Sequence, residues 1–257
     1  MRFKSKLLLI LVLAALVFRF VFSGILASAA GSVRHLTGDR FRSGRIQQTS
    51  LNWAGYAAAS GKFTAVTGSW IIPKVRSSSN LKTDAAWVGI GGVSSQDLIQ
   101  AGTTEVTGVP GKTGYLAWYE MLPDFSQPVA LAVQAGDSIT AAINQKSGNR
   151  WQIILKNNSS GKIFQKNVVY TSTFSSAEWI EEMPSNSDSQ LIPLDNFGVI
   201  QFSGGSAVRN KVKVNIAKSG ARAISLANSQ GKILAAPSVL QNSGSAFYVK
   251  RLPGQIF

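Results

Sequence analysis

From about residue 51 onward, short runs of alternating apolar and polar residues are separated by clusters of Gly, Asn and Ser. Alternation with a period of two is typical of β-strands that have one buried face. The clearest predicted strands cover 139–144, 151–155, 163–170, 208–216, 224–226 and 233–235. No stretch repeats apolar residues at the helical period between recognisable caps. The pattern therefore predicts an all-β domain, either an antiparallel sandwich or a barrel.

The N-terminus carries a different pattern. Arg2, Lys4 and Lys6 precede two apolar runs on either side of Arg19, and the small residues Ala27-Ser28-Ala29 follow. A basic start, an apolar middle and a small-x-small end predict a secretory signal peptide over residues 1–30. Because the apolar stretch is long enough to span a bilayer, an uncleaved membrane anchor is the alternative. In both cases we expect the remainder to be secreted or held at the extracellular cell surface.

Residues 31–50 are polar, basic and rich in turn-forming residues, and they predict a linker or a short pro-segment. Residues 51–257 then form one domain. The chain has a formal net charge of +14, with its basic residues scattered rather than clustered. No nucleic-acid-binding motif is present. An anionic cell wall or membrane surface is therefore a candidate partner, and we expect a monomer.

The residue inventory excludes several kinds of active site. The chain has no cysteine, so thiol nucleophiles, thiolate metal sites and disulfides are absent. Its single histidine, His35, lies in the basic segment and is poorly placed for a Ser-His-Asp triad or a catalytic zinc site. No phosphate-binding glycine motif occurs. An active site must then use a carboxylate, an amide or a hydroxyl, and we expect no metal or organic cofactor.

Seven short motifs follow one another in a specific order. Each is weak alone, but together they resemble the eqolisin family of glutamic peptidases. In chain order they are Asn52-Trp53-Ala54-Gly55, Trp87-Val88-Gly89-Ile90, Leu98-Ile99-Gln100-Ala101-Gly102, Ala117-Trp118-Tyr119-Glu120, Gly136-Asp137-Ser138-Ile139, Ala177-Glu178-Trp179-Ile180-Glu181-Glu182 and Leu191-Ile192-Pro193-Leu194.

The resemblance implies a β-sandwich of two large antiparallel sheets, curved like the lectin (concanavalin) jelly roll, with a peptide groove on a concave sheet face. It also implies a catalytic pair formed by Gln100 and Glu182, with protein or peptide substrates. Trp87 and Glu120 match residues that line the family's cleft. We expect the substrate also to contact Trp118 and Glu178, which belong to the same motifs.

The chemistry suits these residue types. An ionised Glu182 can take a proton from a water molecule that attacks the scissile carbonyl, and can then return the proton to the leaving nitrogen. The neutral amide NH₂ of Gln100 can donate to the developing oxyanion. A single carboxylate acting first as base and then as acid favours acidic working conditions.

Two positions depart from the family pattern: Gly91 stands where relatives carry an acid, and Glu181 stands where they carry an aliphatic residue. Because strand side chains alternate between faces, Glu181 should point into the sheet interior when Glu182 faces the groove. A buried charge there requires a bulge, a partner, or a register in which Glu181 is the catalytic acid. Two other functions stay open: a cell-wall- or carbohydrate-binding module without catalysis, and a glycoside hydrolase that uses Glu120 and Glu182.

Overall fold

The computed structural model describes residues 42–43 and 48–253, so the predicted signal segment and most of the basic segment that follows it lie outside the described residues. The described part consists of strands and loops, with one 3-10 turn at Asn242–Gly244. Within it, no helix is long and apolar enough to cross a membrane.

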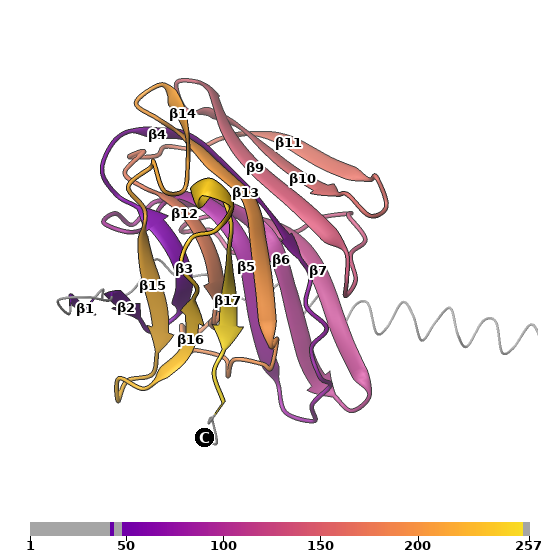
Figure 1. The fold of residues 1–257 in the computed structure, drawn as a ribbon. Coiled ribbons are helices and arrows are strands. Elements are labelled where there is room, and N and C mark those ends of the chain that lie inside the picture. Colours follow the sequence, from indigo (N-terminus) through magenta and orange to yellow (C-terminus); the bar gives the residue numbers. More distant parts are fainter. Residues whose placement is uncertain (1–41, 44–47, 254–257) are drawn as a thin grey trace, which may run out of the picture.

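The strands build two layers that face each other (Figure 1). The first layer has the order β11 (Ile163–Val169), β10 (Arg150–Asn157), β9 (Ser138–Ser147), β4 (Phe63–Ile71), β13 (Val199–Arg209) and β17 (Phe247–Arg251). The second has the order β15 (Arg222–Ala227), β3 (Trp53–Ala58), β12 (Ala177–Glu182), β5 (Lys82–Gly91), β6 (Leu98–Val109), β7 (Lys112–Met121) and β8 (Gln127–Pro128).

Three shorter strands and one hairpin arm complete the ladder. Strand β16 (Ile233–Pro237) pairs with both β15 and β17 and so links the two layers. Strand β14 (Val212–Asn215) returns along β13, and β1 (Arg42–Ser43) pairs with β2 (Gln48–Ser50). The β2–β15 pair is parallel and the other strand pairs are antiparallel. The predicted antiparallel β-sandwich is therefore confirmed.

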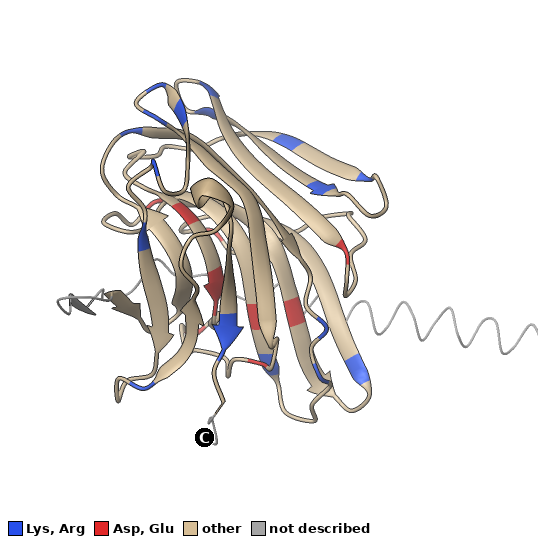
Figure 2. Cartoon of the chain, viewed as in Figure 1, with Lys and Arg blue, Asp and Glu red and all other residues tan. Residues whose placement is uncertain are grey.

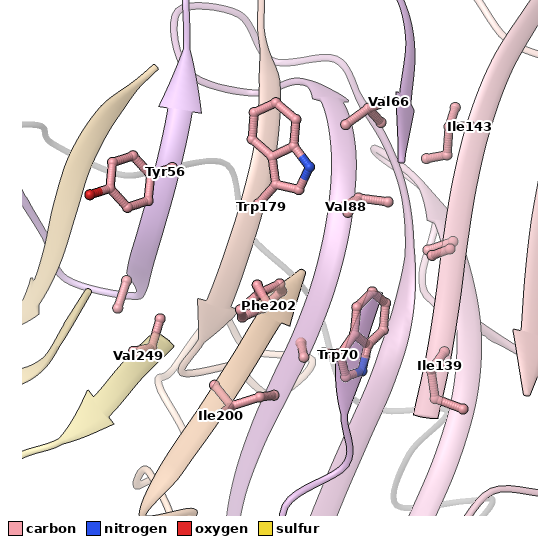
Figure 3. Close-up of a cluster of buried hydrophobic side chains, with 14 of the residues drawn as sticks. Tyr56, Val66, Trp70, Val88, Ile139, Ile143, Trp179, Ile200, Phe202 and Val249 are labelled. Carbon is pink, nitrogen blue, oxygen red and sulfur yellow. The ribbon is translucent and has the colours of Figure 1, made fainter. Parts of the chain in front are cut away.

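The main hydrophobic core lies between the two layers (Figure 3). Trp179 of β12 and Trp70 of β4 are buried there, and the indole N–H of each has a partner. Trp179 Nε1 donates to the main-chain oxygen of Thr67 at 2.8 Å, and Trp70 Nε1 donates to Thr103 Oγ1 at 2.8 Å. Burying a large apolar side chain contributes about 1.5–3 kcal/mol, and these hydrogen bonds remove the penalty for burying a polar N–H.

Most of the predicted hairpins are confirmed, but one predicted strand is wrong. The segment 208–216 is two strands, because β13 ends at Arg209 and the chain reverses into β14. Asn210 and Lys211, at the turn, have φ of 49° and 68°. Left-handed conformations at both positions allow a tight two-residue hairpin. Because the turn lacks glycine, the alternating Lys and Val residues looked like one continuous strand.

Candidate active site

The six residues predicted to form the site lie on one face of the second layer. Gln100 lies on β6, Trp87 on β5, Glu178 and Glu182 on β12, and Trp118 and Glu120 on β7. All six are buried, with exposures between 0% and 3%. This face has its own hydrophobic cluster, separate from the core between the layers, which includes Trp53, Trp87, Trp118 and Ile180. Apolar rings therefore surround the few polar groups.

The strand register aligns four of these positions in one row across the sheet. Glu178 pairs with Gly89, Gly89 pairs with Gln100, and Gln100 pairs with Glu120. Gln100 Nε2 donates to Glu120 Oε2 at 2.6 Å. A Cβ atom at Gly89 would lie 2.9 Å from Leu98 Cδ1 and 3.3 Å from Glu178 Oε2. Glycine at this position therefore leaves the room that the Glu178 carboxyl and the side chain of Leu98 occupy.

Glu182 lies in a second row and has its own supports. Its Oε2 accepts a hydrogen bond from Trp87 Nε1 at 2.7 Å, and its Oε1 accepts one from Asn52 Nδ2 at 3.3 Å. The Trp87 ring meets the Trp53 ring edge-on, with centroids 5.0 Å apart and an interplanar angle of 76°. Ser50 Oγ donates to Asn52 Oδ1 at 2.9 Å. The carboxylate is thus held from two sides by donors that are themselves fixed.

The two predicted catalytic residues share a face but do not lie in adjacent rows. Glu182 aligns, through Ala85, with Thr104, which is four residues along β6 from Gln100, or about 13 Å. The row between them contains Trp87, Gly102 and Trp118. A Cβ atom at Gly102 would lie 2.2 Å from the main-chain oxygen of Ala86, so only glycine fits there. The pair therefore brackets a row of aromatic rings instead of forming a direct hydrogen bond.

Glu178 is a third carboxyl on this face. Neither of its oxygens accepts a hydrogen bond from a described residue. Burial raises the pKa of Glu178 well above its ordinary value, and the nearby Ser176 hydroxyl offsets this only in part. A protonated Glu178 would be a hydrogen-bond donor, not a charge, in weakly acidic solution.

Glu181 points to the opposite face of β12. Strand β12 pairs with β3 and β5 without a bulge, so the predicted alternation of the two adjacent glutamates holds. Glu181 is fully buried and lies beside Asp84, with which it shares a hydrogen bond when one carboxyl is protonated. Of the three alternatives that the sequence left open, a partner for Glu181 is the one observed.

Two supporting residues had no assigned role in the sequence analysis. Asn52 and Trp53 were noted only as part of a motif at the start of the domain, yet Asn52 hydrogen-bonds Glu182 and Trp53 packs on Trp87. The motif's place immediately before a predicted strand was the available signal. Their contact with β12 and β5 arises from strand pairing between distant segments, which no local pattern records.

Comparisons with known proteins give a consistent result. Residues 51–249 match the model of the Peptidase A4 family. Aspergillopepsin-2 of Aspergillus niger is 28% identical over 192 residues, which are 63% of this chain and 68% of that protein. Among solved structures, a scytalido-glutamic peptidase with a transition state analog inhibitor has a TM-score of 0.67 at 23% identity, covering 79% of this chain and 98% of the other. Aspergilloglutamic peptidase from Aspergillus niger has a TM-score of 0.59 at 25% identity, covering 66% and 99%. These likenesses agree with the sandwich described above.

Proposed function

This chain belongs to the Peptidase A4 family and is a glutamic peptidase of the eqolisin type, and we propose that it is an exported, acid-acting endopeptidase that uses Glu182 and Gln100. Glu182 acts as general base on a water molecule and then as general acid toward the leaving nitrogen. The Gln100 amide stabilises the oxyanion of the tetrahedral intermediate, a contribution typically worth about 10²–10³ in rate. Protein or peptide chains are the substrates.

One observation carries this proposal: a buried carboxylate is fixed by two donors on the same sheet face as a buried amide. Trp87 and Asn52 hold the two oxygens of Glu182, which limits the carboxylate to few orientations. Gln100 directs its Nε2 to Glu120, while its Oε1 accepts no hydrogen bond from a described residue. Its second amide hydrogen and its Oε1 are thus suited to a substrate oxyanion and to a water molecule.

Trp118 and Glu178 support substrate binding in this proposal. Trp118 lies in the row between Gln100 and Glu182, where a peptide crossing the sheet would pack on it. Glu178 lies in the row of Gln100, on the other side of Gly89. As a buried protonated carboxyl it would donate a hydrogen bond to a carbonyl oxygen of the substrate.

Residues 1–30 act as the export signal in our proposal, and residues 31–50 as a linker or removable pro-segment. Strand β2 pairs with β15, and the Ser50 hydroxyl holds Asn52, so processing should cut N-terminal to Gln48. The intact mass and N-terminal sequence of protein collected from culture medium would test this. A mature chain that starts after Ser50 would contradict the assigned boundary.

The test of the dyad is digestion of an unfolded protein between pH 2 and 8 with a pepsin-type inhibitor present. We expect acid-favoured, inhibitor-resistant cleavage that disappears in Glu182→Gln, a change that preserves shape and removes the ionisable group. Asp188→Asn, which changes an exposed acid by the same step, should retain activity. A folded Glu182→Gln variant with full activity would rule out the assignment.

A second function, a wall-binding module on the same fold, is favoured by the distribution of charge. Eight of the eleven acidic residues between 48 and 253 are buried, while the lysines and arginines in this range are at least partly exposed. Figure 2 shows acidic bands within the second layer, and basic residues mostly at loops and strand ends. Retention on anionic cell-wall polymer, unchanged by loss of Gln100 and Glu182 and without any cleavage, would favour this alternative.

A further inference from the structure

A cluster of four carboxyl groups occupies one end of the core, behind the candidate active site. This acid cluster consists of Asp84 on β5, Glu105 on β6, Glu181 on β12 and Asp195 in the loop before β13, each at most 1% exposed. Asp84 and Glu105 are direct cross-strand partners, and Glu181 pairs with Ala86, two residues from Asp84 on the same face. Asp195 joins through its main-chain N–H, which donates to Thr83 at 3.3 Å.

The acid cluster holds together only through protons. None of its carboxyl oxygens accepts a hydrogen bond from an N–H or O–H donor among the described residues. Asp84 is the central member, within hydrogen-bonding reach of Glu105, Glu181 and Asp195. A hydrogen bond between two carboxyls requires that one of them be protonated. Full ionisation would leave four negative charges in a region that water does not reach, which is strongly unfavourable.

The surrounding charges cannot neutralise the cluster. The titratable groups that face it are Lys82 and Arg251 near Asp195, Tyr115 near Glu105, and Glu182 from the opposite face of β12. The Arg251 guanidinium donates to the main-chain oxygen of Asp195 at 3.1 Å and to two further carbonyls at 2.8 Å, so its hydrogen bonds go to main chain. Among described residues, no group of three or more His, Asp or Glu side chains is arranged to hold a metal ion.

The pKa values follow from this environment. Burial, strengthened by repulsion between neighbours, raises the pKa of Asp84 and of Glu105 well above the ordinary carboxyl range. Burial raises the pKa of Glu181 to about 8 and that of Asp195 to about 7. Each folded-state pKa lies above the value in the unfolded chain, so the folded protein binds more protons. Stability is therefore complete in acid and is lost as the pH rises toward 7–8.

The acid cluster acts on the strand that carries the proposed catalytic carboxyl. Glu181 and Glu182 are adjacent, and β12 is held between β3 and β5 along its whole length. Repulsion between Glu181 and Asp84 would therefore separate β12 from β5, the strand that carries Trp87. We propose that Glu181, Asp84, Glu105 and Asp195 form a proton-dependent latch that fixes β12 and positions Glu182 in acid, and releases them as the pH approaches neutrality.

The latch makes Glu181 a positioning residue and limits the enzyme to acidic surroundings. An exported protease would lose activity on reaching neutral solution, without an inhibitor or a change in its substrate. The link to activity rests on the proposed role of Glu182, whereas the latch itself has a readout that needs no catalysis.

The experiment measures unfolding by urea at pH 4, 5, 6 and 7, followed by tryptophan fluorescence, for the full exported chain. The variants are Glu181→Gln and Glu105→Gln, with Asp188→Asn as the matched exposed control. Wild type should unfold more easily as the pH rises. Each cluster variant should release about one proton fewer on unfolding, so its unfolding equilibrium constant changes about tenfold less per pH unit. Asp188→Asn should follow wild type.

The second readout is the cleavage rate at pH 4 after incubation at pH 7. Wild type and Asp188→Asn should lose activity together, and the cluster variants should retain more. A wild-type unfolding free energy that is flat from pH 4 to 7 would overturn the latch even if a variant fails to fold, as would stabilisation at pH 7 by millimolar Ca²⁺. Glu182→Gln separates the two proposals, because it should abolish cleavage while keeping the wild-type pH dependence of unfolding.

Discussion

Replacing Trp87 with Phe tests how Glu182 is held. The change removes the indole N–H that donates to Glu182 Oε2 at 2.7 Å and keeps an aromatic ring against Trp53. A hydrogen bond to a charged group contributes about 1.5–3 kcal/mol. With only the longer 3.3 Å contact from Asn52 left, the carboxylate loses its fixed orientation. We expect kcat/KM for a peptide substrate to fall about 10- to 100-fold, mainly in kcat.

Trp151→Phe provides the matched control for this prediction. Trp151 is fully buried in the core between the layers, and its Nε1 donates to the main-chain oxygen of Tyr170 at 3.0 Å. Both changes delete one buried indole N–H, so both should lower the unfolding free energy by about 1–3 kcal/mol. Only Trp87→Phe should lower kcat in steady-state assays at matched folded fraction. Equal kinetic losses in the two variants, or no loss in Trp87→Phe, would refute the reasoning.

Three further outcomes are expected. Gly102→Ala should lower the unfolding free energy by several kcal/mol in urea titrations, because its Cβ would overlap the main-chain oxygen of Ala86 at 2.2 Å; a loss below about 0.5 kcal/mol would contradict this. Asn52→Ala should reduce kcat less than Trp87→Phe, because its bond to Glu182 is longer, at 3.3 Å, and kinetics at constant pH will rank the two. The wild-type unfolding free energy should fall by about 5 kcal/mol between pH 5 and 6, since each of the four cluster protons contributes about 1.4 kcal/mol per pH unit; chemical unfolding in matched buffers measures it.

The sequence carried most of the fold because its strands are antiparallel and local. The hairpin of β9 and β10 and that of β15 and β16 join neighbouring segments through turns with recognisable residues. The failure at 208–216 has the same origin, because the Asn210-Lys211 turn adopts left-handed angles without a glycine to announce them. Alternation defines which residues share a face, but not where one strand ends and its partner begins.

The site was less accessible from the sequence. The motifs named Gln100 and Glu182, but the register that separates them by four positions along β6 depends on the pairing of β5 with both β6 and β12. The acid cluster was beyond prediction for the same reason. Asp84, Glu105 and Asp195 lie far from Glu181 in the chain and carry no shared motif. The sequence showed that Glu181 needed a partner, and only the sheet pairing identifies the partners as other acids.

The two adjacent glutamates make the register of β12 a functional quantity. A slip of one residue would exchange the faces of Glu181 and Glu182, and would put the proposed catalytic carboxyl into the core. Trp179 opposes such a slip from the core side, because its ring is buried and its Nε1 donates to Thr67 of β4 at 2.8 Å. Gly68 makes room for the ring, since a Cβ there would lie 2.9 Å from Trp179 Cδ1. The identity of the catalytic acid therefore depends on a tryptophan on the opposite face of the strand.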